Sequence, residues 1–251
     1  LRRIYDQPAA ALQRPGVDQP AEQAPGAPVP PVAGSTNPMT FENTISKTVI
    51  LFLVVLATAA VGWFIPILMI PGALVGLVLG LVNSFKKEPN VALIVGYAAA
   101  QGLFLGGISG SFEAQWAGIG TQAIIGTFSV FGVTLLLFRS GKVRTSPRMN
   151  KIVLIAMVGY LVFSLVNVVL MLTGIVTDPW GLRSGWLGLA IGAIAVLLAA
   201  YSLVMDFELI QNGVRNRVPE RYGWSAAFGL TVTLIWLYLE ILRILAILRG
   251  D

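Results

Sequence analysis

The sequence contains no cysteine and no histidine, and only 12% of its residues are charged. Without cysteine the chain can form neither disulfides nor thiolate ligands. Without histidine it lacks imidazole bases, imidazole metal ligands and the usual side chain for pH sensing near neutrality. Any proton sensing must therefore use carboxylates. The glycine-rich phosphate loops of soluble nucleotide enzymes are also absent, so no cofactor is expected.

Apolar residues are abundant in the chain. Apolar residues make up 56% of the 251 residues, and the mean hydropathy is +0.79. This is more apolar surface than one soluble core of this length could bury, so we predict an all-α polytopic protein in contact with the lipid bilayer. The formal net charge is +5. The basic residues lie between apolar runs rather than on one aromatic-interleaved face, so nucleic-acid binding is not expected.

Proline divides the chain into two parts. Residues 1–38 hold eight of the fourteen prolines, together with Ala, Gly and Gln. Such a segment cannot bury enough apolar surface to become ordered, so 1–39 is predicted to be a disordered cytoplasmic tail and 40–251 the transmembrane domain. The tail could also serve as a partner-binding arm, because it carries a cluster of Arg2, Arg3 and Tyr5 and disordered segments can fold on binding.

Seven apolar stretches approach or exceed the roughly 20 residues that a helix needs to cross hydrocarbon. They are 44–68, 71–85, 91–108, 121–138, 152–173, 187–211 and 224–248. The second stretch is short and carries Gly72, Gly76 and Gly80 at intervals of four, a spacing that predicts close packing against a neighbouring helix. Fourteen of the seventeen Lys and Arg residues fall on one side of this topology. The positive-inside rule therefore predicts a cytoplasmic N-terminus and an outside C-terminus.

Asp206 follows the apolar run 187–205 with no cationic residue at helical spacing before Arg215. An acid in lipid is costly in either protonation state, so it is by default a hypothesis about ions or protons. For a helix that ends at Gln211, Asp206 lies about 8 Å inside the cytoplasmic end. For a last helix that starts at Trp224, Thr233 lies about 13 Å along that helix, so Asp206 is level with Thr231 or Thr233 and not with Glu240.

Other polar residues in the stretches are weaker candidates. Glu240 lies about 24 Å along the last helix at the standard rise, near the outer interface. Its spacing of three from Arg243 predicts a local ion pair. Gln101 is a further polar group near the middle of the membrane.

Two classes of intramembrane protease can be tested on the residues. The segment GISG at 107–110 matches the G-x-S-G of rhomboid proteases, but no histidine exists to take the proton from Ser109. An aspartyl protease needs two carboxylates that share a proton, with Gly-x-Gly-Asp around one of them, and Asp206 stands in LVMDF instead. We therefore predict that the protein is not an enzyme.

The chain resembles the transmembrane Bax inhibitor motif family over about residues 40–251. The resemblance rests on SLVMDFELI at 202–210 and LYLEILRIL at 237–245, and on GLFLGGIS at 102–109, which looks like the actinobacterial branch. It implies a seven-helix bundle with the last helix surrounded by the other six. It also implies a pH-sensitive calcium leak closed on the cytoplasmic side by paired acids on the last two helices, in the plasma membrane of a bacterium.

Carried onto this chain, the resemblance makes Asp206 the first acid of the pair. Ungapped alignment of the last helix puts Thr233 at the partner position, and Glu240 two turns too far out. The basic residue that the family has at the end of its second helix corresponds to Lys86 or Lys87. Gln101 stands where related bacterial sequences have an acid.

Two functions are therefore carried forward. The first is a passive, proton-modulated leak of calcium or another cation, in which Asp206, Thr233, Glu240 and Gln101 line the pathway and Lys86, Lys87 and Arg215 are possible charge partners. Asp206 alone could give a metal ion only a weak, transient site, because calcium takes six to eight oxygen ligands. The alternative is a non-conducting regulator of another membrane complex, such as a membrane protease, contacted through the tail. A secondary transporter ranks third, because no repeated halves with broken helices are visible.

Overall fold

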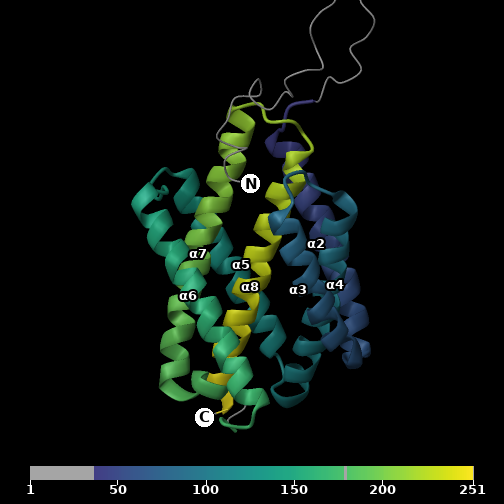
Figure 1. Cartoon of the computed structure of the whole chain (residues 1–251), viewed down its shortest axis with the longest axis vertical. Helices are drawn as coiled ribbons and strands as arrows, with labels where there is room; N and C mark the ends of the chain where they lie inside the picture. The colour runs from purple at the N-terminus through teal and green to yellow at the C-terminus, as the bar shows by residue number, and fades with distance from the viewer. Residues whose placement is uncertain (1–36, 178–179, 251) are drawn as a thin grey trace, which may run out of the picture.

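The computed structural model describes residues 37–177 and 180–250, and these are almost entirely helical (Figure 1). Seven helices in this part of the chain are long and apolar enough to cross a membrane. They are α2 (Phe41–Phe64), α3 (Met69–Phe85), α4 (Val91–Gln115), α5 (Ile119–Arg139), α6 (Pro147–Leu172), α7 (Gly185–Arg215) and α8 (Tyr222–Gly250). Short 3-10 helices, η2 (Pro66–Leu68) and η3 (Gly181–Arg183), precede α3 and α7. The prediction of an all-α, seven-helix membrane protein is confirmed. Of the predicted tail, residues 1–36 lie outside the described residues.

Three helices begin at capping residues that the sequence supplies. The side chains of Thr40, Asn90 and Ser146 each accept a hydrogen bond from the backbone N–H three residues further on. Each cap satisfies one of the backbone N–H groups that have no partner at the start of a helix. Leaving such a group without a partner near lipid would be costly. Pro147 follows the Ser146 cap, where its missing N–H costs nothing.

Several predicted boundaries are wrong for local reasons. The stretch 44–68 is not one helix, because α2 ends at Phe64 and Pro66 opens the separate turn η2. The predicted end at Gln211 is also wrong, since α7 continues through Asn212 and the buried Gly213 to Arg215. The third helix does not stop at 108. Its glycines pack against neighbouring helices instead of ending it, and α4 runs on to Gln115.

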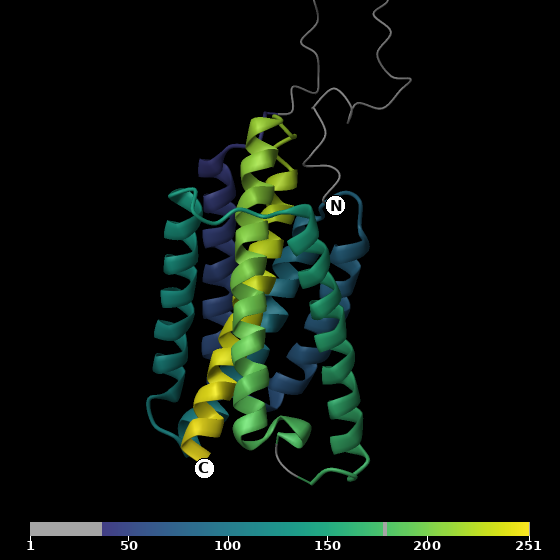
Figure 2. The same ribbon diagram turned by 90° about the vertical axis from the view of Figure 1, so that its left-hand side faces the viewer.

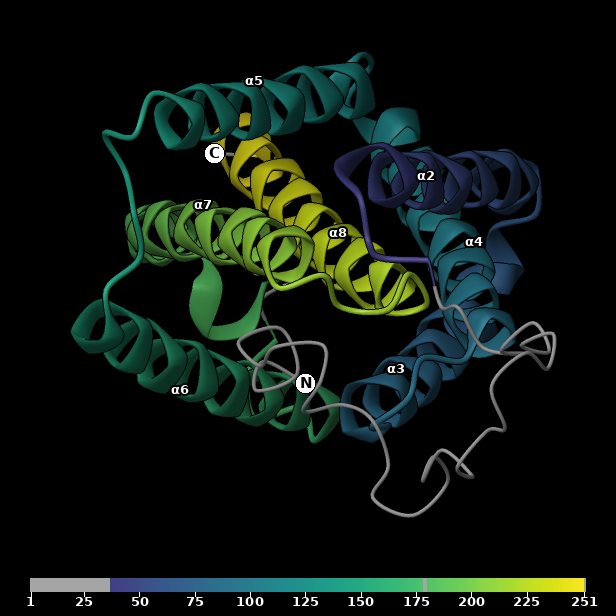
Figure 3. The same cartoon turned by 90° about the horizontal axis from the view of Figure 1, so that it is seen from above.

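Helix α8 is the central element of the bundle and crosses it obliquely between the other helices in the view from above (Figure 3). Within its apolar window 61% of the residues are buried, against 11% for α6. It packs against α2, α4, α5 and α7, whereas α3 and α6 pack mainly against α4 and α7. The prediction that the last helix is central is confirmed; in the described residues α6 reaches it through Tyr160, and α3 packs mainly on α4. Side chains on α8 are thus held mainly by protein rather than lipid.

Glycines set the distance between α4 and the two helices that precede it. Gly102 and Gly106 of α4 lie against the α2 backbone, and a Cβ on either would collide with a carbonyl oxygen, that of Val55 or Ala59. The glycines 72, 76 and 80 of α3 face Ala100, Gln101 and Tyr97 of α4, as their packing interpretation predicts. Close backbone contact of this kind is how helices associate where lipid and side chains are equally apolar.

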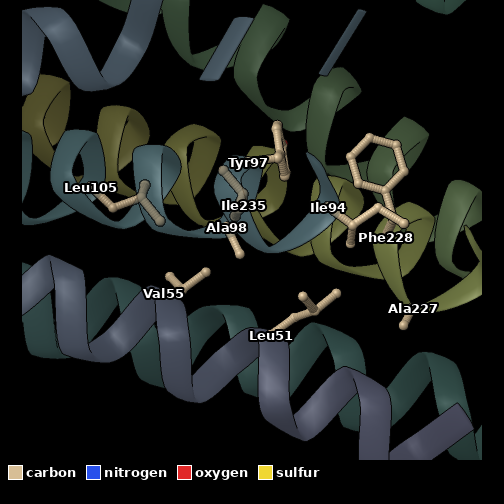
Figure 4. Close-up of a cluster of buried hydrophobic side chains, with 9 residues drawn as sticks. All are labelled: Leu51, Val55, Ile94, Tyr97, Ala98, Leu105, Ala227, Phe228 and Ile235. Atoms are coloured by element: carbon tan, nitrogen blue, oxygen red, sulfur yellow. The ribbon is translucent and has the colours of Figure 1, made fainter. Parts of the chain in front are cut away.

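A buried cluster joins α2, α4 and α8 near the middle of the bundle (Figure 4). It contains Leu51, Val55, Ile94, Tyr97, Ala98, Leu105, Ala227, Phe228 and Ile235. The rings of Tyr97 and Phe228 meet edge-on with centroids 5.0 Å apart. This contact fixes α8 against α4 on one side, leaving its opposite side for α7.

The loops with most basic residues gather at one end of the bundle, which we call the basic end; α8 finishes at the other, which we call the C-terminal end (Figure 2). At the basic end the segment before α2 pairs with the loop before α8. Met39 N–H donates to the Val218 carbonyl at 2.8 Å, and Glu220 N–H donates to the Asn37 carbonyl at 2.8 Å. The segment directly before α2 is thereby attached to the segment that leads into the central helix.

Candidate functional site

Asp206 lies deeper in its helix than the sequence predicted. Because α7 ends at Arg215, nine residues further on, the acid is about 14 Å from the helix end at 1.5 Å per residue, rather than 8 Å. Thr233 stands eleven residues after the start of α8, about 17 Å along it. The two side chains are therefore at similar depths on neighbouring antiparallel helices.

The Asp206 carboxylate contacts α8 at two points. Its Oδ2 accepts a hydrogen bond from Thr233 Oγ1 at 2.7 Å. Its Oδ1 lies over Gly229, where a Cβ would come within 3.3 Å of the oxygen. Thr233 Oγ1 is also 3.2 Å from the Gly229 carbonyl, so one hydroxyl proton serves two acceptors. The carboxylate is half-buried and held by a neutral donor, in the space that a glycine leaves open.

Several charged side chains at the basic end are bonded to groups other than Asp206. The contacts are Lys47 with Glu220, Arg144 with Gln211, Thr145 with Glu208, and Arg221 with Glu88. Among the described residues Asp206 forms no ion pair, and Thr233 is its only hydrogen-bond donor. The charge of this acid therefore has no cationic partner within residues 37–177 and 180–250.

The remaining predicted site residues are not brought to Asp206. Gln101 lies against Gly76 of α3. Lys86, Lys87 and Arg215 are exposed at the basic end, and no contact joins them to Asp206 in the described part of the chain. Glu240 lies seven residues beyond Thr233 on α8, which is about 10 Å further along the helix.

Glu240 belongs to a second polar cluster, toward the C-terminal end of the bundle. The carboxylate is buried and pairs with Arg243, whose Nη2 lies 2.5 Å from Oε2, so the predicted local ion pair is present. It also accepts hydrogen bonds from Trp236 Nε1 at 3.3 Å and from the Tyr160 hydroxyl. Arg183 of η3 donates to Tyr160 at 3.0 Å and to Ser164.

Sequence reasoning missed Tyr160, Ser164 and Arg183 as members of this cluster. A weak signal existed, because Arg183 is the only basic residue between the fifth and sixth apolar stretches and stands between Trp180 and Trp186. Nothing in the pattern indicated that α6 would place Tyr160 opposite Glu240. The meeting depends on how α6, η3 and α8 pack.

The acidic side chains and Ser109 are the groups that could bind a metal ion or act as a nucleophile. Within the described ranges no three acidic side chains lie close enough together to hold a metal ion, so Asp206 could supply only part of a coordination shell. The hydroxyl of Ser109, in the GISG segment, is 2.6 Å from the hydroxyl of Tyr238. A Cβ on the neighbouring Gly107 would come within 2.7 Å of the Met69 side chain, whereas one on Gly110 would make ordinary contacts with Trp63.

In the described part of the chain, fold and site together define a polytopic membrane protein with seven membrane-length helices and a half-buried acid, Asp206, between the last two. The sequence matches the family model described as Bax inhibitor 1 like over residues 7–250. A search of curated proteins finds no match. Because the matched region covers nearly the whole chain, the protein belongs to the Bax inhibitor 1 like family.

Proposed function

We propose that the protein is a passive cation leak, with calcium as the expected ion and Asp206 as the acidic element of its gate. The observation that carries this proposal is the half-buried Asp206 carboxylate, which has Thr233 as its only donor among the described residues. A negative charge at this depth that lacks a protein cation attracts a mobile one. Membership of the Bax inhibitor 1 like family supports the same function, because resemblance to the transmembrane Bax inhibitor motif family implies a calcium leak.

The proposed pathway enters at the basic end, which we place in the cytoplasm of a bacterial cell according to the positive-inside rule. One carboxylate and one hydroxyl cannot satisfy calcium, which takes six to eight oxygens. The ion would therefore keep most of its water while it passes Asp206. Weak, transient coordination suits conduction, because tight binding would retain the ion.

Replacing Asp206 with Asn is expected to lower calcium permeation at least severalfold. The amide keeps the shape and can still accept from Thr233, but it removes the attracting charge. Calcium entry into proteoliposomes that contain a fluorescent indicator measures the effect. Glu208→Gln is the matched control, because Glu208 stands on the same helix and bonds to Thr145 instead. Unchanged permeation in Asp206→Asn would reject the gate and favour the non-conducting regulator contacted through the tail.

The same assay gives a pH dependence with a definite sign. Protonation of Asp206 removes its charge, so permeation is expected to fall as the pH is lowered. The Asn side chain does not titrate, so the variant should lose this dependence. A pH response that is the same in Asp206→Asn and in the wild type would assign proton sensing to another group.

Replacing Thr233 with Asp is expected to change the form of the pH response. The new carboxylate would lie within hydrogen-bond reach of Asp206, since the present Oγ1–Oδ2 distance is 2.7 Å. Two acids at such a distance share a proton and titrate as a pair. Permeation should then change in two separate steps across the pH range, where the wild type shows one. Thr231→Asp is the control, because the Thr231 hydroxyl instead donates to the Ala227 carbonyl. Two steps in the control variant, or one step in Thr233→Asp, would contradict the pairing.

A further inference from the structure

A cavity of about 500 Å³ lies beside the Glu240 cluster, between α4, α6, η3 and α8. Its volume is in the range of small-molecule sites. Most of its wall is apolar or aromatic, and two guanidinium groups reach it. The wall includes Phe104, Phe112, Trp180 and Trp236 with Arg183 and Arg243. Phe112 and Trp180 stack with centroids 5.6 Å apart, which gives this wall a flat aromatic surface.

Both guanidiniums have a buried N–H group without a partner. Arg243 is 8% exposed, and its Nε and Nη2 donate to Glu240 while Nη1 has no acceptor. Arg183 uses both terminal nitrogens on Tyr160 and Ser164, and its Nε has no acceptor. A buried donor without an acceptor is costly, and more so when charged. These two N–H groups have almost no accessible surface, so the oxygen atoms of a ligand in the cavity would bond to them only if the arginine side chains moved.

The charge of the cavity wall favours an anion. Among the described residues the wall contains two arginines, Arg183 and Arg243, and one carboxylate, Glu240, so its net charge is +1. Glu240 already accepts from three side chains, namely Tyr160, Trp236 and Arg243. A cationic ligand would therefore meet two guanidiniums and a carboxylate that is already occupied. Asp178, five residues before Arg183 in the sequence, lies outside the described residues.

The cavity borders on the lipid. Helix α6 packs against α7 and η3, while its contacts with α4 are at most isolated. Val168 of α6 lines the cavity and is nevertheless 50% exposed. Arg243 is seven residues before the end of α8, about 10 Å along the helix. An acidic headgroup near an interface, with its chain directed between α4 and α6, fits these positions.

We propose that this cavity binds a membrane amphiphile with an acidic headgroup, held by Arg183 and Arg243, whose hydrocarbon chain lies along the aromatic wall toward α6. Phosphate and carboxylate headgroups share the required chemistry, because both accept charge-assisted hydrogen bonds from guanidinium. This site is separate from Asp206. It is expected to persist in the Asp206→Asn variant whatever the outcome of the ion-flux measurements.

The test uses tryptophan quenching by lipids with brominated chains, because Trp180 and Trp236 line the cavity. The full-length protein, with the lipid-exposed Trp63 and Trp186 changed to Phe, is placed in phosphatidylcholine liposomes. Brominated phosphatidylglycerol or brominated phosphatidylcholine is then added at equal mole fraction. We expect association with the acidic lipid to be about tenfold stronger, the scale of one hydrogen bond to a charged group. Equal quenching by the two lipids would overturn the proposal without any arginine variant.

Arginine variants assign the preference to the cavity. Arg183→Gln should abolish most of it, and Arg183→Lys, which keeps the charge, should retain part of it. Arg249→Gln is the matched control, because Arg249 lies at the same end of α8 and donates to the Ala117 carbonyl instead. A preference that survives in Arg183→Gln, or is lost in Arg249→Gln, would indicate general surface charge. Loss of the preference on addition of inorganic phosphate would assign the site to a soluble anion and contradict the amphiphile.

Discussion

Replacing Glu240 with Gln should lower the free energy of unfolding by about 3–5 kcal/mol, the cost of removing one member of a buried ion pair. The side chains of Glu240 and Arg243 are 6% and 9% exposed. Gln keeps the volume and can still accept from Tyr160 and Trp236, but it leaves Arg243 as a buried charge without a counterion. For a chain of this length the loss corresponds to a melting temperature about 10 °C lower. Thermal unfolding in detergent, followed by tryptophan fluorescence, measures it.

A second substitution separates charge from packing. In the double variant Glu240→Gln/Arg243→Met the uncompensated cation is gone, so most of the lost stability should return. Glu88→Gln is the surface control, because Glu88 and Arg221 lie 3.8 Å apart with side chains 54% and 50% exposed. Its effect should stay below about 1 kcal/mol. If Glu240→Gln destabilises no more than Glu88→Gln, the buried pair does not carry the stability assigned to it.

The second large effect is expected at Gly106. In Gly106→Ala the new Cβ would collide with the Ala59 carbonyl and force α2 away from α4. The backbone cannot rotate out of the way as a side chain can, so a cost of about 1–3 kcal/mol is expected for overpacking. Gly132→Ala on α5 is the control, because a Cβ there meets nothing within 4 Å. Both substitutions gain the same helix propensity, about 1 kcal/mol.

The comparison of the two alanine variants isolates the collision. Gly132→Ala should melt at or slightly above the wild-type temperature, and Gly106→Ala below it. Cleavage by a protease in detergent gives an independent measure, since a displaced α2 should expose the segment around Ile65 and Pro66. Equal melting temperatures for the two variants would show that α2 and α4 can separate without loss of stability.

Much of the site could be predicted by aligning helix positions. Depth along the helices predicts Thr231 or Thr233 opposite Asp206, and the family alignment predicts Thr233; in the structure Thr233 contacts Asp206 at 2.7 Å. The depth predicted from a helix end at Gln211 is too small, because α7 continues to Arg215. Buried against its neighbours, Gly213 continues the helix. Local propensity is a weak guide where tertiary packing holds a residue.

Other polar contacts could not be predicted in the same way. Gln101 was placed near mid-membrane, but depth does not determine which neighbour a side chain faces, and it faces Gly76. Arg183 and Tyr160 are 23 residues apart and meet through the packing of η3 on α6. Helical periodicity relates residues on one helix, not the rotation of one helix against another.

The class of protein and the pattern of membrane spans follow from the sequence. Its apolar runs are long enough to cross hydrocarbon and carry few charges. In lipid the backbone must satisfy its hydrogen bonds internally, which such runs do as helices. Packing alone determined that Lys47, Arg144 and Arg221 bond to groups other than Asp206. It also determined that Glu240, Arg243 and Arg183 surround one cavity. Contacts between helices depend on which small residues allow close approach, and that is settled only when all seven helices are assembled.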